Sequence, residues 1–144
     1  MRLLFLLICF IFGAPLCYNM KYFLLSCLCL MSLGVFAQDA WVAPDQAKDV
    51  VNPYVGNQIA AQKGGMLYQK LCWTCHGKTG LGDGPAGKTL NPKPKNFKSE
   101  SVQEQSDGEL FWKIANGKGM MLPYKHSLSE EQLWQLVNFI RTIE

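Results

Sequence analysis

The sequence predicts an all-α domain of three or more helices joined by long loops. Two stretches in the C-terminal half, 107–116 and 129–143, carry apolar side chains at the spacing of one helical face. Between residues 77 and 97, five glycines and three prolines exclude regular structure. No stretch has a convincing strand pattern. A loop of this length in a small domain is expected to be functional or to wrap around something.

Residues 1–37 have the composition of a targeting segment rather than of a folded domain. Their only charged side chains are Arg2 and Lys21, and two apolar runs account for most of the rest. The second run alone has a basic start at Lys21, an apolar centre and a small-residue end, which are the three parts of a signal peptide. Met20 is therefore an alternative true start of the protein.

Cleavage after Ala37 would export the remainder of the chain to the periplasm. Four of the six cysteines lie in the leader, so only Cys72 and Cys75 remain after cleavage. Exported proteins normally use cysteines in structural disulfides, and a single close pair indicates another use. Two other interpretations of the leader stay open: an uncleaved membrane anchor and a lipoprotein that begins at Cys27.

Residues 38–57 are predicted to form an extended N-terminal arm. The stretch contains Pro44 and Pro53 and lacks a sustained helical stripe. We favour packing of its apolar side chains against the domain over contact with a partner, because isolated apolar residues need no special explanation. These side chains are Trp41, Val42, Val50, Val51, Tyr54 and Val55.

Residues 58–144 are expected to be the folded domain, and the first helix spans 58–71. Apolar side chains recur there at roughly helical spacing. Gly64 and Gly65 each cost a helix about 1 kcal/mol relative to alanine, so we expect another backbone to come close at this point. The helix over 129–143 is the candidate.

The two later helices have recognisable ends. Ser106 or Asp107 can cap the first of them, and Gly117 stops it. In the second, Ser129 and Gln132 have the spacing of a capping box. The second helix also has one apolar face, formed by Leu133, Leu136, Val137 and Ile140 and flanked by Trp134 and Phe139.

The chemistry of the chain is concentrated in five consecutive residues, Cys72-Trp73-Thr74-Cys75-His76. Two thiols three positions apart, followed directly by a histidine, are the attachment signature of a c-type haem. Each thiol can form a thioether with one vinyl group, and the histidine can bind the iron. We therefore predict one covalently bound haem c, attached at Cys72 and Cys75, with His76 as an axial ligand.

A bare Cys-x-x-Cys pair also occurs in zinc sites and in dithiol redox sites. A zinc site would need two more soft ligands, but no third cysteine remains after the leader and His126 is the only other histidine. A dithiol site would need a βαβ pattern, whereas a glycine-rich loop follows His76. Both alternatives are therefore disfavoured.

A haem protein that transfers electrons needs a second axial ligand, and methionine opposite histidine raises the reduction potential. On the helix over 58–71, core packing is the simpler explanation for Met66. Met120 and Met121 lie in a loop between two helices, where methionine is less easily explained as core filler. His126 stays open, because histidine is the commonest metal ligand.

The chain resembles the class I monohaem cytochromes c over most of residues 58–144. The resemblance rests on the haem motif and on three further stretches, which are Gly65-Met66-Leu67-Tyr68, Gly82-Asp83-Gly84-Pro85 and Leu128-Ser129-Glu130-Glu131-Gln132-Leu133-Trp134. It implies the cytochrome c fold, with three or more helices wrapped around one covalently bound haem.

The resemblance also implies roles for individual residues. The family's axial methionine lies in a Gly-x-Gly-x-Met loop, which puts the ligand at Met121. Proline usually follows that methionine, and a leucine stands there in this chain, so Met120 stays open as the alternative. The carbonyl of Pro85 would accept a hydrogen bond from the axial histidine. The family's glycine–aromatic contact between its first and last helices falls on Gly65 and Phe139.

These features predict a periplasmic monohaem cytochrome c that carries single electrons between redox partner proteins of a respiratory chain and is not an enzyme. Of 14 basic side chains two lie in the leader, so 12 remain against 11 acidic ones, and this balance does not indicate nucleic acid binding. The membrane is expected as a partner only if the leader is retained. The lysines of the loop after the motif could dock an acidic partner; they are Lys78, Lys88, Lys93, Lys95 and Lys98.

Two other functions stay open. The chain could be a haem c subunit bound permanently to a larger respiratory reductase or oxidase, with the arm as its anchor. It could also be a haem protein that reacts with a gas or a peroxide through a weakly held distal position.

Overall fold

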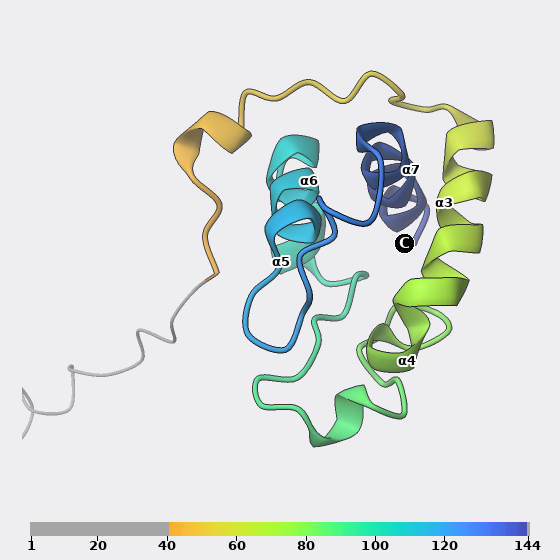
Figure 1. The fold of residues 1–144 in the computed structure, drawn as a ribbon, viewed down its shortest axis with the longest axis vertical. Coiled ribbons are helices and arrows are strands. Elements are labelled where there is room, and N and C mark those ends of the chain that lie inside the picture. The colour runs from red at the N-terminus through yellow and green to blue at the C-terminus, as the bar shows by residue number, and fades with distance from the viewer. Residues whose placement is uncertain (1–40, 144) are drawn as a thin grey trace, which may run out of the picture. The chain divides into compact units, whose positions relative to one another are not determined.

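The computed structural model describes residues 41–143 (Figure 1), so the predicted leader lies outside the described residues. Helices and loops make up this part of the chain, and no strand occurs in it, which confirms the predicted all-α fold. The elements are η2 (Asp45–Ala47), α3 (Gln58–Leu71), α4 (Trp73–His76), η3 (Gly87–Thr89), α5 (Glu100–Gln103), α6 (Asp107–Asn116) and α7 (Glu130–Arg141). Between residues 41 and 143, none of the helices has the length and apolar character needed to cross a lipid bilayer.

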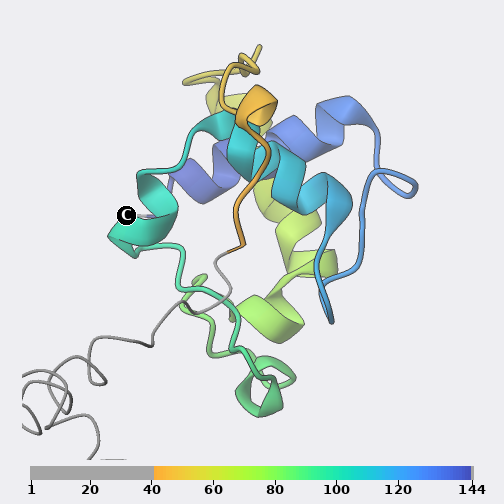
Figure 2. The ribbon, with the colours of Figure 1, turned by 90° about the vertical axis from the view of Figure 1, so that its left-hand side faces the viewer.

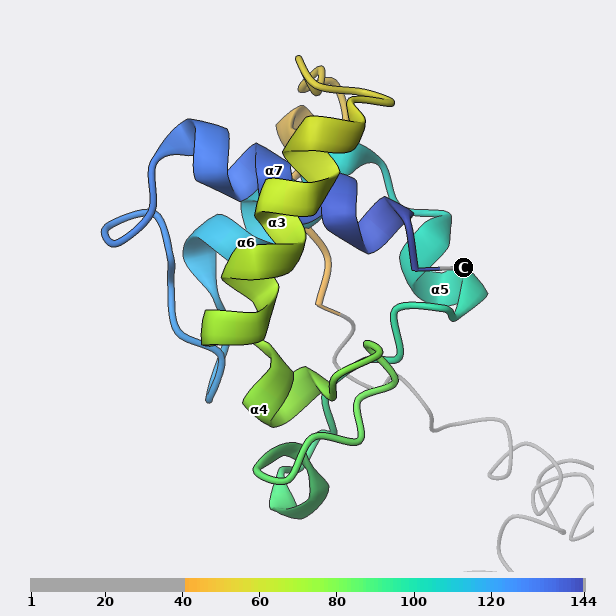
Figure 3. The same cartoon turned by 90° about the vertical axis from the view of Figure 1, so that its right-hand side faces the viewer.

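Helix α7 is the centre of the fold, with α6 and α3 packed against it (Figures 1 and 3). The predicted capping box is present: Ser129 Oγ accepts from the amide of Gln132 at 3.2 Å, and Gln132 Oε1 accepts from the amide of Ser129 at 2.9 Å. The predicted apolar face is buried, and Trp134, Gln135 and Asn138 are buried with it. A helix enclosed on so much of its surface organises the core.

Helix α6 spans the residues that the sequence predicts. Ser106 caps it by accepting from the amide of Glu109, and the Glu109 carboxylate accepts from the amide of Ser106 in return. Gly117 ends it with a φ of 61°, a backbone conformation that favours glycine. Phe111 stacks on Trp134 of α7 with a ring-centroid distance of 4.2 Å, which fixes α6 against the central helix.

The arm is mostly extended, contains the short turn η2, and packs against α6 (Figure 2). A Cβ on Gly108 of α6 would lie 2.0 Å from the carbonyl oxygen of Ala47, so the two backbones touch. The buried residues of the arm are Ala43, Ala47 and Asn52, whereas Val51 and most other apolar side chains singled out from the sequence are exposed. The arm is therefore held by small residues and by polar contacts.

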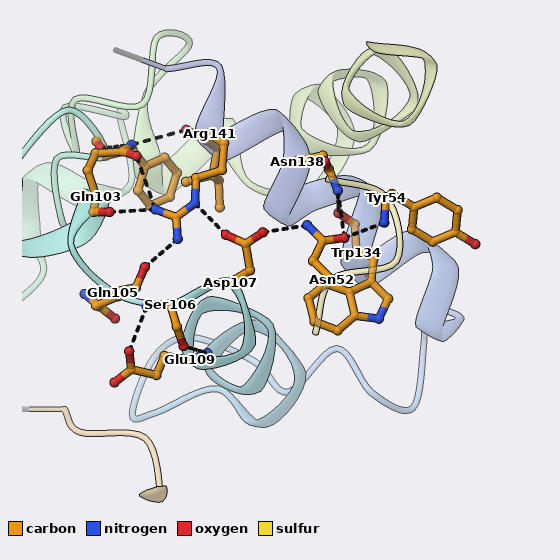
Figure 4. A network of polar contacts seen from close by, with 12 residues as sticks. Asn52, Tyr54, Gln103, Gln105, Ser106, Asp107, Glu109, Trp134, Asn138 and Arg141 are labelled. Atoms are coloured by element: carbon orange, nitrogen blue, oxygen red, sulfur yellow. Dashed lines mark hydrogen bonds and ion pairs between the residues drawn. The ribbon is translucent and has the colours of Figure 1, made fainter. Parts of the chain in front are cut away.

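A polar network joins the arm, α6 and α7 (Figure 4). Asn52 donates to one carboxylate oxygen of Asp107 at 2.7 Å, and Arg141 Nε donates to the other at 2.7 Å. Asn52 Oδ1 accepts from Asn138 at 3.3 Å. Arg141 also donates to the main-chain carbonyl of Gln103 at 2.8 Å. Each buried polar side chain of this network thus has a partner, as a buried network requires.

Candidate metal centre

The two thiols and the imidazole lie on one face of a single helical turn. Helix α3 ends at Leu71, and α4 begins after Cys72, whose carbonyl accepts from the amides of Cys75 at 3.2 Å and His76 at 2.9 Å. Residues spaced three and four apart are neighbours on a helix surface. The pentapeptide therefore presents Cys72, Cys75 and His76 to the same side.

The glycine-rich loop packs against the back of this turn. A Cβ on Gly84 would lie 2.4 Å from the carbonyl oxygen of Thr74, and a Cβ on Gly87 would lie 2.2 Å from that of Cys75. The amide of Ala86 donates to the carbonyl of Thr74 at 2.9 Å. The glycines are needed for this close approach, and the loop thereby supports the motif from the side opposite to its functional groups.

The His76 imidazole is half-buried and stacks on Phe97, with ring centroids 4.7 Å apart and an interplanar angle of 21°. Burial lowers the pKa of His76, and the nearby backbone of Lys95 opposes that shift. Its Nδ1 atom is buried and has no hydrogen-bond partner among residues 41–143. An orphaned buried nitrogen is uncommon in proteins, and a ring kept neutral suits metal ligation.

The predicted hydrogen bond between His76 and the carbonyl of Pro85 is absent, since Nδ1 is unpaired and the nearby backbone group belongs to Lys95. Pro85 is exposed and precedes Ala86, which is bonded to Thr74 on the back of the motif. The loop thus carries Pro85 past the far side of α4, and the stretch around Lys95 runs beside the imidazole instead.

An apolar cavity borders the motif, and Cys72, His76 and Met121 all line it. The rest of its lining is Tyr68, Phe97, Ile114, Tyr124, Leu136 and Ile140. The cavity measures about 30 Å³, and its lining carries the chemical groups that hold a c-type haem. A thiol, a neutral imidazole and a thioether among apolar walls are the groups that a c-type haem requires.

Met121 and Met120 differ sharply in position. Met121 is half-buried at the cavity, whereas Met120 is 77% exposed. Both lie in one tight turn: Lys118 and Met121 exchange hydrogen bonds of 3.1 and 3.0 Å, and Gly119 has a φ of 60°. Of the other candidates, Met66 is 61% exposed and His126 is exposed, and neither lines the cavity. The geometry therefore favours Met121.

The surroundings of Cys72 do not suit a zinc thiolate. Burial raises the pKa of the Cys72 thiol to about 11, and the neighbouring Cys75 adds to this shift. Zinc binds the thiolate form. Within residues 41–143 no group of three or more histidine, cysteine or acidic side chains is placed to hold a metal ion. The donors that are present fit thioether attachment better.

Three aromatic residues of the cavity were given no role at the site from the sequence: Tyr68, Phe97 and Tyr124. Tyr68 stands four residues before Cys72, one helical turn away, and this spacing alone could have placed it beside the motif. No local pattern indicates Phe97, because it reaches the imidazole from the end of an irregular loop.

Comparisons with known proteins agree with this geometry. Residues 59–140 match the family model described as Cytochrome C oxidase, cbb3-type, subunit III. No curated protein matches the chain.

Two solved structures are similar. One is titled a reducing HAO-like protein complex of Kuenenia stuttgartiensis, Kustc0457/Kustc0458; it is 23% identical with a TM-score of 0.53, and the match covers 60% of this chain and 44% of that one. At that identity the likeness extends to the fold alone. The other, titled KustC0563 c-type cytochrome, is 31% identical with a TM-score of 0.46, over 56% of this chain and 96% of that one.

Proposed function

The chain belongs to the cytochrome c oxidase, cbb3-type, subunit III family and is a class I c-type cytochrome, and from this premise we propose that it carries single electrons between redox partners in the periplasm. The observation that supports this role is that Cys72, His76 and Met121 line one apolar cavity. Covalently bound haem c, of which we propose one, would supply a reversible one-electron change at its iron.

The residues at the site have separate roles in this proposal. Cys72 and Cys75 would hold the cofactor by thioethers, and His76 and Met121 would bind the iron. A soft thioether sulfur favours the reduced state and so raises the reduction potential. Apolar walls such as Leu136 limit the access of water. Ligation by both His76 and Met121 would leave no position on the iron for a substrate, so we propose a carrier rather than an enzyme.

The exposed lysines support a proposal about how partners dock. Lys78, Lys88, Lys93, Lys95 and Lys98 are all exposed on the loop after the motif. A positive surface next to the redox centre would speed encounter with an acidic partner, and salt would screen that attraction. Electron delivery to the physiological acceptor should therefore slow as ionic strength rises; a rate that is independent of salt would contradict this docking surface.

The axial assignment is tested by replacing each of the adjacent methionines with alanine. Met121→Ala should abolish the ferric absorption band of sulfur-ligated haem, lower the reduction potential and let the ferrous protein bind carbon monoxide. Met120→Ala, the matched control, should leave all three unchanged, because that side chain points into solvent. Loss of the band in the Met120 variant alone would reverse the assignment. Carbon monoxide binding by the unmodified ferrous protein would favour a gas-reactive function instead.

A second function is supported by the family description and by the surface of the arm. The matched family is named for a subunit of an oxidase. Val51 and Val55 of the arm are 81% and 74% exposed, and Ile59 at the adjoining start of α3 is 66% exposed. Such side chains could contact another subunit of a respiratory complex. Size-exclusion chromatography of a native extract, followed by a stain for covalent haem, distinguishes the two: a carrier elutes near 16.2 kDa or below, and a subunit elutes with a much larger assembly.

A further inference from the structure

Two adjacent side chains of α3 hold the backbone that follows the imidazole. The Tyr68 hydroxyl donates to the carbonyl of Gly77 at 2.5 Å, and Gln69 Nε2 donates to the carbonyl of Lys78 at 3.2 Å. Gly77 is the residue directly after His76. The main chain that carries the imidazole is thus fixed from a neighbouring helix as well as by its own helical turn.

The Tyr68 contact is buried and short. The side chain is 1% exposed and its ring lies between two others, at 5.0 Å from Phe139 and 6.1 Å from Phe97. Phe97 in turn stacks on His76. Tyr68 is therefore linked to the His76 imidazole in two indirect ways: by its hydrogen bond to the carbonyl of Gly77 and by its ring contact with Phe97.

The position of Gly77 explains why such a contact matters. Its φ of 83° ends α4 immediately after the imidazole, at a residue whose backbone has more freedom than any other. The carbonyl of His76 is held separately by the amide of Gly82 at 2.8 Å. Removal of the Tyr68 hydroxyl would leave the carbonyl of Gly77 with only the longer hydrogen bond from the amide of Gly80, at 3.3 Å, and the backbone of Gly77 could rotate to find a better donor.

We propose that Tyr68 is a positioning residue that sets the orientation of the His76 ring at the iron, with Gln69 in a lesser supporting role. The inference rests on the proposed function, because it takes His76 as an axial ligand. Hydrogen bonds that orient a ligand from outside the coordination sphere commonly tune metal sites. The donor here acts on the ligand's main chain rather than on its ring nitrogen, which is unpaired.

The test compares Tyr68→Phe with Tyr54→Phe in the purified, haem-loaded protein. Both remove one hydroxyl and keep the ring, but Tyr54 packs against the core without lining the cavity. The readouts are the hyperfine-shifted NMR signals of the axial histidine and the g-values of the ferric protein, which report ligand orientation. Tyr68→Phe should shift or double these signals, and Tyr54→Phe should leave them unchanged.

Signals of Tyr68→Phe that superimpose on those of the unmodified protein would overturn the inference, even if the melting temperature falls. If Tyr68→Phe does not accumulate with haem, Gln69→Leu is the decisive variant, because Gln69 is exposed and its loss does not open the core. A smaller shift of the same signals in Gln69→Leu supports the inference, and no shift overturns it. An unmodified protein without a histidine-ligated spectrum would contradict the proposed function itself.

Discussion

The backbone of α3 at Gly64 lies directly on the main-chain carbonyl of Gln135 in α7. A Cβ built on Gly64 would stand 1.9 Å from that oxygen and 2.5 Å from its carbon. At the next residue, a Cβ on Gly65 would stand 3.1 Å from the ring of Phe139. The two helices thus cross at a point where no side chain fits between them, and this crossing fixes the helix that leads into the metal-binding motif.

Gly64→Ala is expected to destabilise the protein, although alanine is the better helix former. The methyl group would meet main-chain atoms that move only if the helices part, and overpacking of this kind costs about 1–3 kcal/mol or more. The gain in helix propensity offsets about 1 kcal/mol of that. Gly65→Ala should cost less, because the ring of Phe139 can turn aside. Denaturant unfolding of the two variants measures the difference; equal stabilities would contradict the crossing described.

Arg141→Lys should lower the free energy of unfolding by about 1–2 kcal/mol, because lysine cannot form the forked set of hydrogen bonds. The guanidinium donates to Asp107 and to the carbonyls of Gln103 and Gln105. Its side chain and that of Asp107 are only 26% and 22% exposed, so water screens the pair weakly.

Lys63→Met provides the control for this change, at the exposed pair of Lys63 and Glu131, which are 3.9 Å apart. Exposed pairs contribute about 0–1 kcal/mol, so this variant should unfold at nearly the same denaturant concentration as the unmodified protein. If it loses as much stability as Arg141→Lys, the polar network of Figure 4 has no special role.

Tyr68 should make the stability of the protein fall at alkaline pH. Burial raises the pKa of its hydroxyl well above 10.0, the ordinary value, and nearby Asp83 adds to the shift. Above about pH 10 the unfolded chain loses this proton and the folded protein keeps it, so the unfolded state gains stability as pH rises. The contribution is present in full below that pH.

Comparison of the unmodified protein with Tyr68→Phe over this range isolates the effect, because their other titrating groups are identical. The stability advantage of the unmodified protein should narrow as pH rises above about 10. The measurement is the free energy of unfolding at each pH. An advantage that stays constant would mean that the hydroxyl titrates alike in both states.

Local signals predicted the three longest helices and the motif. The bounds of α3 and α6 match the predicted ranges. Ser129 caps α7 as its capping-box pattern indicates, and the helix ends at Arg141, two residues before the predicted end. The contact between Gly65 and Phe139 was also predicted, by resemblance to the class I cytochromes c, and the cost of a glycine pair in a helix indicated close packing at the same point.

Contacts distant in sequence could not be predicted from local patterns. Asn52 donates a hydrogen bond to Asp107, which is 55 positions away, and no sequence pattern near either residue predicts this contact. The carbonyl of Pro85 was assigned by resemblance as the hydrogen-bond acceptor of His76. The irregular loop carries Pro85 away from the imidazole instead, and the path of such a loop depends on where each glycine allows a turn. The valines of the arm were expected to pack, yet Ala43 and Ala47 are the buried residues, since small side chains allow closer approach.

The apoprotein should be poorly folded, because the cavity wall and the hydrophobic core are the same residues. Tyr68, Ile114, Leu136 and Ile140 belong to both. A domain of this size buries only a modest fraction of its surface, so the face turned to the cavity needs a covering group. The Cys72→Ala, Cys75→Ala double variant, which cannot attach haem, is expected to lose helical circular dichroism and cooperative thermal unfolding.

Thr74→Ala is the matched control for the double variant, since it alters an exposed residue between the two cysteines and leaves both thiols in place. It should keep the pigment after extraction with acidified acetone, the helical signal and a sharp transition. A double variant that unfolds as cooperatively as this control would mean that Leu136 and its neighbours close the core without a cofactor, and the cavity would then be only a packing gap between α3, α6 and α7.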